Sequence, residues 1–335
     1  MHARYNDSSL KIERLAYPLQ PEVQMDLIQL LRTEWIRTDY HWLEAMNGDY
    51  SGDLAITSML ARYKGKAVAT ATVHFAQTLP EIAVVGNVLT HRDYRGKGLA
   101  ARVIEATLDQ AVTAGCSICL LGTSKKPENI YQRHGFVWQN GVIMRKCFGD
   151  ENIETEYFAP GQSVITRPAN WGDMPGLTQF IVQPLKTVCL DYPRGLLSGL
   201  YTPVERCVSN FPILWYDTVA RDGILTVLVG QQNNRLFGFG SATPGAGAAR
   251  RHTAIIDLTA HQNYESHLAA LLDDLIEGCQ KRGIQKSQAF VASGDGAKLD
   301  CLRSAGFIHI EKLPAGLRLS TETRDVIVLE KMFLL

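Results

Sequence analysis

Apolar residues recur along this chain with two kinds of spacing, one typical of strands and one typical of helices. The same succession of strand-like and helix-like segments occurs twice. In the first half, apolar runs or period-two alternation indicate strands, and apolar residues at helical spacing indicate helices. The predicted strands of this half cover residues 9–16, 55–63, 67–76, 82–89 and 117–121, with one or two more in 136–148. The predicted helices cover residues 22–37, a short segment ending at Met46, and residues 98–114 and 127–134.

A second cycle follows a segment of different composition. Residues 149–162 are polar and acidic and end in Pro160-Gly161, so we interpret them as a linker between domains 1–148 and 163–335. Residues 183–212 contain four prolines and are expected to be irregular. The other predicted elements are strands at 164–167, 225–230, 236–241, 254–258 and 289–291, and helices at 174–182, 263–281 and 299–304.

Short signatures recur in the two halves at an offset of about 170 residues. The order of strand, long helix, strand, short helix and Gly-Phe is the same in both. We therefore predict an α/β protein with mixed (α+β) sheets, built as a tandem duplication of one unit. The matching signatures are Leu89-Thr90-His91 with Leu258-Thr259-Ala260-His261, Gly115 with Gly283, and Gly135-Phe136 with Gly306-Phe307.

Composition and charge narrow the class of protein. Apolar residues make up 46% and charged residues 20% of the 335 residues, as in soluble globular proteins. Lys plus Arg and Asp plus Glu both number 34, so neither nucleic acid nor a membrane surface is an expected partner. The seven cysteines are scattered, and Cys116 and Cys119 are interpreted as a buried structural pair. Residues 1–18 carry no signal-like apolar run, so a reducing, cytoplasmic location is expected.

The candidate chemistry lies where a strand passes through a polar turn into a helix. The helix begins in Arg95-Gly96-Lys97-Gly98-Leu99-Ala100, where two glycines expose the first backbone N–H groups. These N–H groups lack intrahelical partners, and the helix dipole adds partial positive charge to the full charges of nearby Arg and Lys side chains. Such a helix start predicts an anion site, and we expect the anion to be a diphosphate.

Other phosphate-binding and metal-binding motifs fit the chain less well. Residues 96–101 spell the GxGxxA of a dinucleotide-binding fold, but residues 90–95 separate the strand from the first glycine. Residues 116–126 also contain no Asp or Glu to hold a ribose. A P-loop would need Gly-Lys-Ser or Gly-Lys-Thr, and a zinc site would need a His, Cys and Glu spacing that we do not find, so no metal is expected.

The turn resembles the cofactor motif of the GNAT superfamily of N-acetyltransferases, which reads Arg or Gln, two residues, Gly, one residue, then Gly or Ala. The resemblance covers residues 10–147 well and residues 163–335 in outline. It implies two tandem acyl-CoA N-acyltransferase folds that use acetyl-CoA as co-substrate. It further implies that the pyrophosphate binds the backbone of Arg95, Gly96, Lys97, Gly98, Leu99 and Ala100, and that the pantetheine arm pairs with Asn87, Val88 and Leu89.

A second motif of that family places a Tyr four residues before Gly-Phe, and Tyr131 stands at this position. The resemblance implies that the Tyr131 phenol protonates the leaving thiolate, because the two groups have comparable pKa values. On its own, the same residue also fits a packed aromatic side chain. The family often has an Asn seven residues before the Tyr, where this chain has Ser124, and Asn129 lies two residues before it. Both are kept as candidate cofactor contacts.

The general base is left open by the sequence. The family can use a Glu on the strand before the glycine turn, at a position that is Val84 in this chain. Glu81 and His74 are the candidates, and each also fits a structural role. An ordered water that passes the proton onward is a further alternative. Direct attack of an amine on the thioester needs no covalent enzyme intermediate.

The first helices are expected to form the acceptor side. Glu34-Trp35 and Asp39-Tyr40-His41-Trp42 combine acids with aromatic rings, which suits a small cationic amine and equally an ordinary half-buried helix pair. In the second half, the matching turn at 261–267 has no glycine and carries an acid, and Leu302 stands where Tyr131 does. The second domain is therefore expected to keep the fold without the cofactor site.

The expected function is acetyl transfer from acetyl-CoA to a primary amine of a small-molecule or peptide acceptor, by a monomer or homodimer. The alternatives are a non-catalytic acyl-CoA-binding module and an enzyme of the same fold that uses another acyl-CoA.

Overall fold

The computed structural model describes residues 9–35, 40–123, 128–150, 152–206 and 210–333. The chain forms two compact units, which are described separately. Residues 170–175, which the sequence placed in the second domain, belong to the first unit. Unit 1 comprises Met1–Ile153 with Asn170–Pro175, and unit 2 comprises Glu154–Ala169 with Gly176–Leu335.

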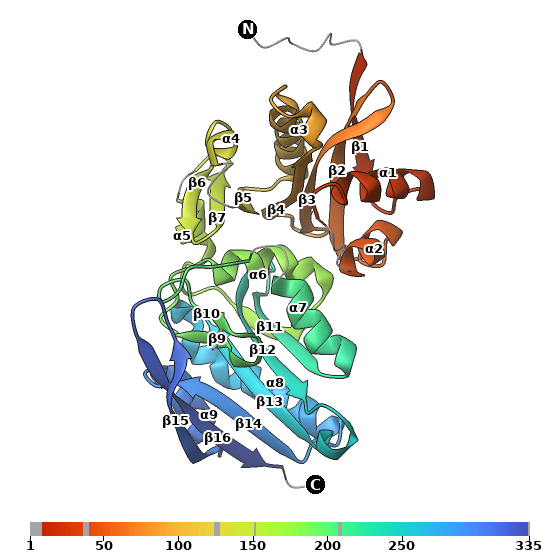
Figure 1. Cartoon of the computed structure of the whole chain (residues 1–335). Helices are drawn as coiled ribbons and strands as arrows, with labels where there is room; N and C mark the ends of the chain where they lie inside the picture. The colour runs from red at the N-terminus through yellow and green to blue at the C-terminus, as the bar shows by residue number, and fades with distance from the viewer. Residues whose placement is uncertain (1–8, 36–39, 124–127, 151, 207–209, 334–335) are drawn as a thin grey trace. The chain divides into compact units, whose positions relative to one another are not determined.

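The described residues of unit 1 form a seven-stranded sheet in the order β1-β2-β3-β4-β5-β7-β6 (Figure 1). Neighbouring strands are antiparallel except β4 and β5, which run parallel and are joined through α3. The strands are β1 (Leu10–Ala16), β2 (Leu54–Tyr63), β3 (Lys66–Ala76), β4 (Ile82–Thr90), β5 (Ile118–Gly122), β6 (Val137–Asn140) and β7 (Ile143–Cys147). The helices are α1 (Pro21–Leu31), α2 (Tyr40–Asn47), α3 (Leu99–Ala114) and α4 (Glu128–Gln132), with 3₁₀ turns η2 (Arg92–Tyr94) and η3 (Trp171–Asp173).

Helices α1 and α3 cover opposite faces of this sheet. Met59 and Ala61 of β2 pack in the same core cluster as the start of α3, whereas Leu60 between them packs with α1. Successive residues of a strand point to opposite faces, so the two helices lie on opposite sides. Helix α3 ends, as predicted, at Gly115, which has a left-handed φ of 93°.

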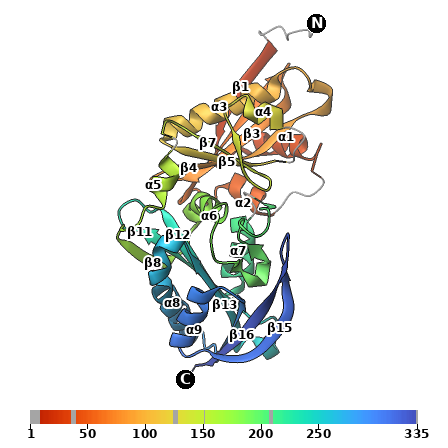
Figure 2. The ribbon, with the colours of Figure 1, turned by 90° about the vertical axis from the view of Figure 1, so that its left-hand side faces the viewer.

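Unit 2 repeats this topology strand for strand. Read from β8, its described seven-stranded sheet has the order β8-β11-β12-β13-β14-β16-β15, and β13 and β14 are again the parallel pair. Helix α8 lies against β11, β12 and β13, with α9 beside it (Figure 2). The strands are β8 (Val164–Pro168), β11 (Ile224–Gly230), β12 (Leu236–Pro244), β13 (Thr253–Ala260), β14 (Lys286–Ala292), β15 (Ile308–Arg318) and β16 (Thr323–Met332).

The remaining elements of the second half are α5 (Ile153–Tyr157), α6 (Met174–Ile181), α7 (Asn210–Asp217), α8 (Leu268–Lys281) and α9 (Gly296–Ser304), the short strands β9 (Cys189–Asp191) and β10 (Leu196–Leu197), and the 3₁₀ turns η4 (Tyr192–Arg194), η5 (Val219–Arg221), η6 (Ala248–Arg250) and η7 (Gln262–His267). The predicted tandem duplication is thereby confirmed, since equivalent elements follow one another in the same order and the sheets match.

Several element limits differ from the sequence-based expectation. Helix α1 ends at Leu31 rather than near residue 37, because the chain turns there with Thr33 N bonded to Leu30 O at 3.1 Å. The expected linker contains α5, and the expected irregular region contains β9, β10 and the first residues of α7. The hairpin of β15 and β16 was not predicted. Most residues of β15 are exposed, so burial imposes no apolar alternation on them.

The segment of residues 170–175 is held in unit 1 by a capped turn and an aromatic stack. The Asn170 side chain accepts a hydrogen bond from Gly172 N, and the Asp173 carboxylate accepts one from Asn170 N at 2.8 Å. The buried Trp171 ring stacks on Tyr50 with centroids 3.6 Å apart. A fragment that ends at residue 148 therefore lacks an aromatic side chain that unit 1 buries.

Candidate functional site

The parallel strands β4 and β5 of unit 1 pair over only part of their length. Their pairing runs from Ile82 with Ile118 to Val85 with Leu121, and β4 then continues to Thr90. Beyond Val85, the backbone N–H and C=O groups of β4 on the side of β5 are therefore not paired with β5. They are the groups that a ligand could use as hydrogen-bond partners.

Strand β4 also carries a bulge in this region. Its register with β3 shifts between Thr70 and Thr72, so that Asn87 and Val88 together face a single residue of β3. Asn87 has a φ of 53°, in the left-handed region that Asn adopts more readily than most residues. Both bulge residues are half-buried. The sequence placed the pantetheine contact at these residues and at Leu89 but did not predict the bulge.

The turn from β4 into α3 presents backbone amides to open space. Gly96 and Gly98 have φ values of 75° and 77°, which strongly favour glycine. Apart from its neighbours in the chain, a Cβ atom at either position would have no protein atom within 4 Å, so the space on that side of the turn is open. An intrahelical bond joins Arg102 N to Gly98 O at 3.3 Å, and the N–H groups of Leu99 and Ala100 precede it. This geometry suits an anion at the start of α3.

Arg95 in this turn has an acidic partner. Its Nη2 lies 2.6 Å from Glu34 Oε2, and its Nε donates to Thr90 O at 3.1 Å. The two charged side chains are about half exposed, so the ion pair is weak. Glu34 was expected on the acceptor side, and the structure joins it to the turn. A bound diphosphate would compete with this carboxylate for Arg95.

Tyr131 on α4 is buried beside the point where β4 and β5 separate. It is 7% exposed, meets Phe136 edge-on at 6.2 Å, and belongs to the core cluster that contains Val85 and Leu121. Burial raises the pKa of Tyr131, and a hydrogen bond with the Thr123 side chain offsets part of that rise. The phenol therefore stays protonated at neutral pH, as a proton donor must. The sequence analysis missed Thr123.

The two candidate bases lie at different distances from the bulge. His74 Nδ1 is 3.1 Å from Val84 O, and because a carbonyl only accepts, the neutral ring keeps its lone pair on Nε2. Glu81 immediately precedes β4, and its carbonyl accepts from Ser117 N at 2.8 Å. A strand rises about 3.3 Å per residue, so the stretch from Glu81 to Asn87 spans about 20 Å. His74, opposite Val84, is the nearer candidate.

The structure describes only some of the other predicted site residues. Ser124 and Asp39 lie outside the described residues, and Asn129 is exposed on α4. Trp35 and Trp42 meet edge-on with centroids 6.0 Å apart, and Trp35 is 39% exposed. The structure thus brings together the aromatic pair of the expected acceptor side, and its role in recognition stays a prediction.

The corresponding turn of unit 2 has a different conformation. Residues 262–267 form the 3₁₀ turn η7, which leads directly into α8 and carries Glu265. Tyr264 in this turn is buried, with its ring stacked on Phe237 at 4.1 Å. Strands β12 and β13 pair in continuous register along their described length. Along this length β13 therefore has no bulge equivalent to the one in β4.

A segment of unit 2's own chain lies where its parallel strands separate. The pairing of β13 and β14 ends at Ile255, and Asp257 and Phe290 each come two residues past the last pair. Tyr192 contacts both. Its N–H donates to Asp257 Oδ2 at 2.7 Å, and its ring stacks on Phe290 with centroids 4.7 Å apart. We call residues 188–192 the wedge.

Buried charges hold the wedge. Lys298 Nζ on α9 donates to Asp257 Oδ1 at 2.6 Å and to Cys189 O at 2.7 Å, and Asp295 Oδ1 accepts from Val188 N at 2.6 Å. Burial raises the pKa of Asp257 to about 6. Burial disfavours the Lys298 ammonium, but Asp257, Cys189 and Asp295 together outweigh that effect, so the pKa of Lys298 is raised. Both groups are therefore charged at neutral pH. An Asp inside the apolar strand of residues 253–260 was the signal that the sequence analysis overlooked.

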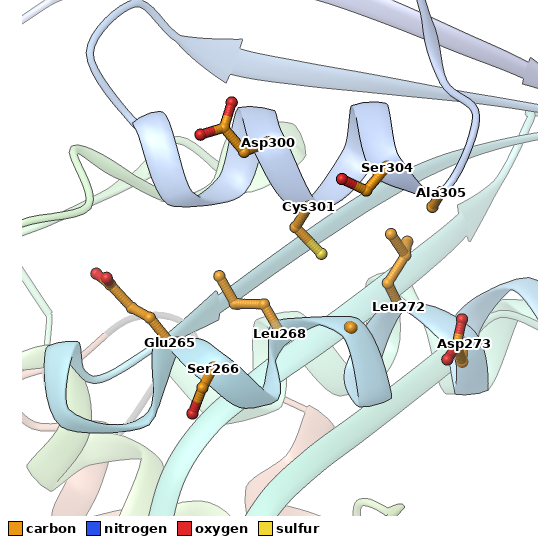
Figure 3. Close-up of a pocket in the computed structure, with 10 residues that line it drawn as sticks. Glu265, Ser266, Leu268, Leu272, Asp273, Asp300, Cys301, Ser304 and Ala305 are labelled. Carbon is orange, nitrogen blue, oxygen red and sulfur yellow. The ribbon is translucent and has the colours of Figure 1, made fainter.

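A pocket of about 400 Å³ lies between α8 and α9 of unit 2 (Figure 3). In the close-up, Leu268, Leu272 and Cys301 point into the space between the two helices, while the Asp300 carboxylate points away from it. The titratable groups among its described lining residues are acids and a thiol, which do not suit a diphosphate. Its lining residues are Glu265, Ser266, Leu268, Ala269, Leu272, Asp273, Asp300, Cys301, Ser304 and Ala305.

The cysteines and acids give no sign of metal chemistry in the part of the chain that the structure describes. Cys116 and Cys119 are buried and unbridged, as expected, and burial raises the pKa of Cys116 to about 12. Among the described residues no group of three or more His, Cys, Asp and Glu side chains could hold a metal ion. None of the described helices is both long enough and apolar enough to span a membrane.

Comparisons with known proteins match part of this chain to one family. Residues 25–136 match the model of the acetyltransferase (GNAT) family. A search of curated proteins gave no match. Similar solved structures include a GNAT-family acetyltransferase from Streptococcus pneumoniae, with 20% identity, a TM-score of 0.44 and coverage of 51% of this chain and 100% of that chain.

Two further structures are similar to about half of this chain. The ribosomal-protein-alanine N-acetyltransferase from Brucella melitensis has 17% identity and a TM-score of 0.42, and covers 50% of this chain and 99% of its own. A GNAT-superfamily phosphinothricin acetyltransferase from Sinorhizobium meliloti, in complex with acetyl-CoA, has 14% identity and a TM-score of 0.41, and covers 50% and 88%. The match to the acetyltransferase (GNAT) family thus lies within unit 1, whose strand order unit 2 repeats.

Proposed function

We propose that unit 1 transfers an acetyl group from acetyl-CoA to a primary amine of a small-molecule or peptide acceptor. The observation that carries this proposal is the turn at Gly96 and Gly98, whose left-handed glycines open the first amides of α3 to a diphosphate. The bulge at Asn87 and Val88 then offers backbone groups to the pantetheine arm where β4 has left β5.

In this reaction the acceptor nitrogen attacks the thioester carbonyl directly. The N–H of Val88 polarises that carbonyl, because a preorganised donor stabilises the developing oxyanion. The carbon–sulfur bond breaks as the carbon–nitrogen bond forms, and the thiolate takes a proton from Tyr131. The proton that leaves the amine restores the phenol by way of the base or of solvent. The raised pKa of Tyr131 supports this role, since the phenol reaches the reaction protonated.

For the base we favour His74 over Glu81. The contact of His74 Nδ1 with Val84 O at 3.1 Å holds this imidazole beside β4, three residues from the bulge at Asn87. Glu81 stands at the far end of β4 from the bulge. An ordered water between His74 and the amine serves equally well.

The test is a thiol-release screen of the full chain with acetyl-CoA, malonyl-CoA and propionyl-CoA against a library of amino acids, polyamines, aminoglycosides and peptides. The proposal expects acetyl-CoA turnover that depends on one class of amine. Tight acetyl-CoA binding without turnover across the library would instead indicate an acyl-CoA-binding module. Turnover with another acyl-CoA alone would overturn the choice of donor.

A further inference from the structure

The pocket between α8 and α9 of unit 2 plays no part in the reaction proposed for unit 1. Its volume of about 400 Å³ falls within the range of small-molecule sites. Leu268, Leu272 and Cys301 point into it from the two helices (Figure 3). Burial raises the pKa of Cys301 to about 11, so this thiol is neutral at pH 7. The interior of the pocket is therefore uncharged and suits an apolar part of a ligand.

Two carboxylates lie at opposite ends of this interior along α8. Glu265 stands in the turn η7 before the helix, and Asp273 stands in the second turn of the helix. Neither side chain forms an ion pair with any residue that the structure describes. The negative charge of Asp273 adds to the raised pKa of Cys301, so the field of this carboxylate reaches the interior of the pocket.

Two basic side chains next to the pocket are already bonded to other groups. Lys331 Nζ donates to Ala305 O at the end of α9. Arg303 Nη1 lies 3.8 Å from Asp300 Oδ1, on a carboxylate that points away from the pocket. The described lining residues themselves include no Lys, Arg or His. The pocket therefore keeps an excess of negative charge that a ligand can balance.

The position of the pocket in the repeated fold makes this charge informative. Chain order equates α8 with α3 and α9 with α4, so the pocket begins at the helix start that corresponds to the glycine turn of unit 1. That turn carries Arg95 and Lys97, whereas η7 carries Glu265. Equivalent places of the two units thus carry opposite charges, and they should favour ligands of opposite charge.

We propose that the pocket between α8 and α9 binds a small organic cation with an apolar body, an alkylammonium ion. Its alkyl chain lies against Leu268, Leu272 and Cys301, and its ammonium group meets Glu265 or Asp273 at an end of the pocket. An anion of the same size meets the same carboxylates and is repelled. This inference is independent of the proposed function, because it involves neither acyl-CoA nor unit 1.

The test is calorimetric titration of the full chain at pH 7 with three probes of similar size, which are hexylamine, hexanol and hexanoate. We expect hexylamine to bind about 10-fold more tightly than hexanol, as for two weak ion pairs, and hexanoate to bind least tightly. The preference for the amine should shrink in about 1 M salt, because salt screens exposed charges.

The double substitution Glu265→Gln and Asp273→Asn removes both charges at nearly constant size. The preference for hexylamine over hexanol should then fall to within about 2-fold. The affinity for hexanol should stay unchanged, which also shows that the variant is folded. The matched control is Glu277→Gln, since Glu277 is an exposed acid of the same helix that pairs with Lys281 at 2.5 Å and does not line the pocket. The control should keep the full preference.

A third variant, Ala269→Phe, tests the location. Ala269 lines the pocket from an exposed position of α8, so a phenyl ring there fills the space without entering the core. It should weaken hexylamine and hexanol alike, by at least about 5-fold. Equal binding of the two by wild type, a preference that survives the double substitution, or unchanged binding by Ala269→Phe would overturn the inference. A wild type that binds none of the three probes overturns it too, and leaves the proposed function of unit 1 standing.

Discussion

The two units share one topology and differ at the place where their parallel strands separate. In unit 1, β4 bulges at Asn87 and the following turn opens its amides through Gly96 and Gly98. In unit 2, β13 keeps its register with β12, and the wedge meets the groups on β13, β14 and α9. Under the proposed function, the fold leaves these backbone polar groups to an outside ligand in unit 1, whereas in unit 2 its own chain satisfies them.

In unit 2, charged side chains satisfy the backbone groups of the wedge. Its amides at Val188 and Tyr192 are bonded to carboxylates, and its carbonyl at Cys189 is bonded to the Lys298 ammonium. These carboxylates are buried, and a buried charge is costly unless it is paired and hydrogen-bonded. Unit 2 therefore depends on a charged cluster at the place where, under the proposed function, unit 1 binds acetyl-CoA.

Tyr131 and its counterpart Leu302 give the largest expected contrast. Tyr131→Phe should lower kcat by about 10²–10⁴-fold, the range for loss of a general acid, with the Kd for acetyl-CoA changed by less than about 3-fold. Leu302→Met, at a fully buried position of α9, should leave kcat unchanged. Steady-state kinetics and calorimetry measure both quantities. Full activity of Tyr131→Phe would remove the proton-donor role.

The wedge predicts a large effect confined to unit 2. Lys298→Met leaves Asp257 buried without its cation and should destabilise unit 2 by about 3–5 kcal/mol. Adding Asp257→Asn should restore part of that loss, because the amide oxygen still accepts from Tyr192 N. Pulsed hydrogen exchange of β13 in denaturant measures the change. A shift below about 0.5 kcal/mol would show that the charges do not hold the wedge.

The two turns can be compared by placing the same carboxylate in each. Gly98→Asp should weaken acetyl-CoA binding at least about 100-fold, because it sets a negative charge against the diphosphate. Gly98→Asn is the matched control for shape and for the positive φ, which Asn tolerates, and should weaken binding less than about 10-fold. Ser266→Asp in unit 2 should change nothing. Equal losses for Asp and Asn at position 98 would point to backbone strain rather than charge.

A smaller effect is expected in the pH dependence of the stability of unit 2. His261 of unit 2 is buried and stacked on Phe158, and burial lowers its pKa to about 4. The unfolded chain binds a proton below about pH 6.5 that the folded unit takes up only near pH 4, so stability falls as the pH drops through this window, by at most about 3 kcal/mol.

The non-titrating variant His261→Gln isolates this term. Between pH 7 and pH 4.5 it should lose less stability than wild type, measured as the denaturant midpoint for exchange of β13. Parallel pH dependence of the two proteins would mean that His261 takes up its proton as easily folded as unfolded.

Periodicity and turn chemistry were enough to predict the repeated architecture. The helix expected at 98–114 is Leu99–Ala114, with Gly115 as its cap, because an apolar stripe and a terminal glycine are local signals. The signals for the glycine turn were equally local, since Gly96, Gly98 and the start of α3 lie within a few positions, and its role as an anion site stays a prediction. These features need no knowledge of what packs against them.

Long-range pairs were not predictable in this way. The Asp257–Lys298 pair, the stack of Tyr192 on Phe290 and the approach of Lys66 to Tyr94 join residues that only the folded sheet brings together. The bulge at Asn87 was missed because a single residue of positive φ hardly alters an apolar strand pattern.

Hydrogen exchange of the full chain with and without acetyl-CoA tests most directly the claim of two copies of the fold and one copy of the site. We predict protection at the bulge of residues 87–89 and the turn of residues 95–101. The amides of residues 262–268 and of the wedge should exchange at the same rate with and without ligand. Protection at those residues of unit 2, or protection that leaves the turn of unit 1 unchanged, would contradict this account.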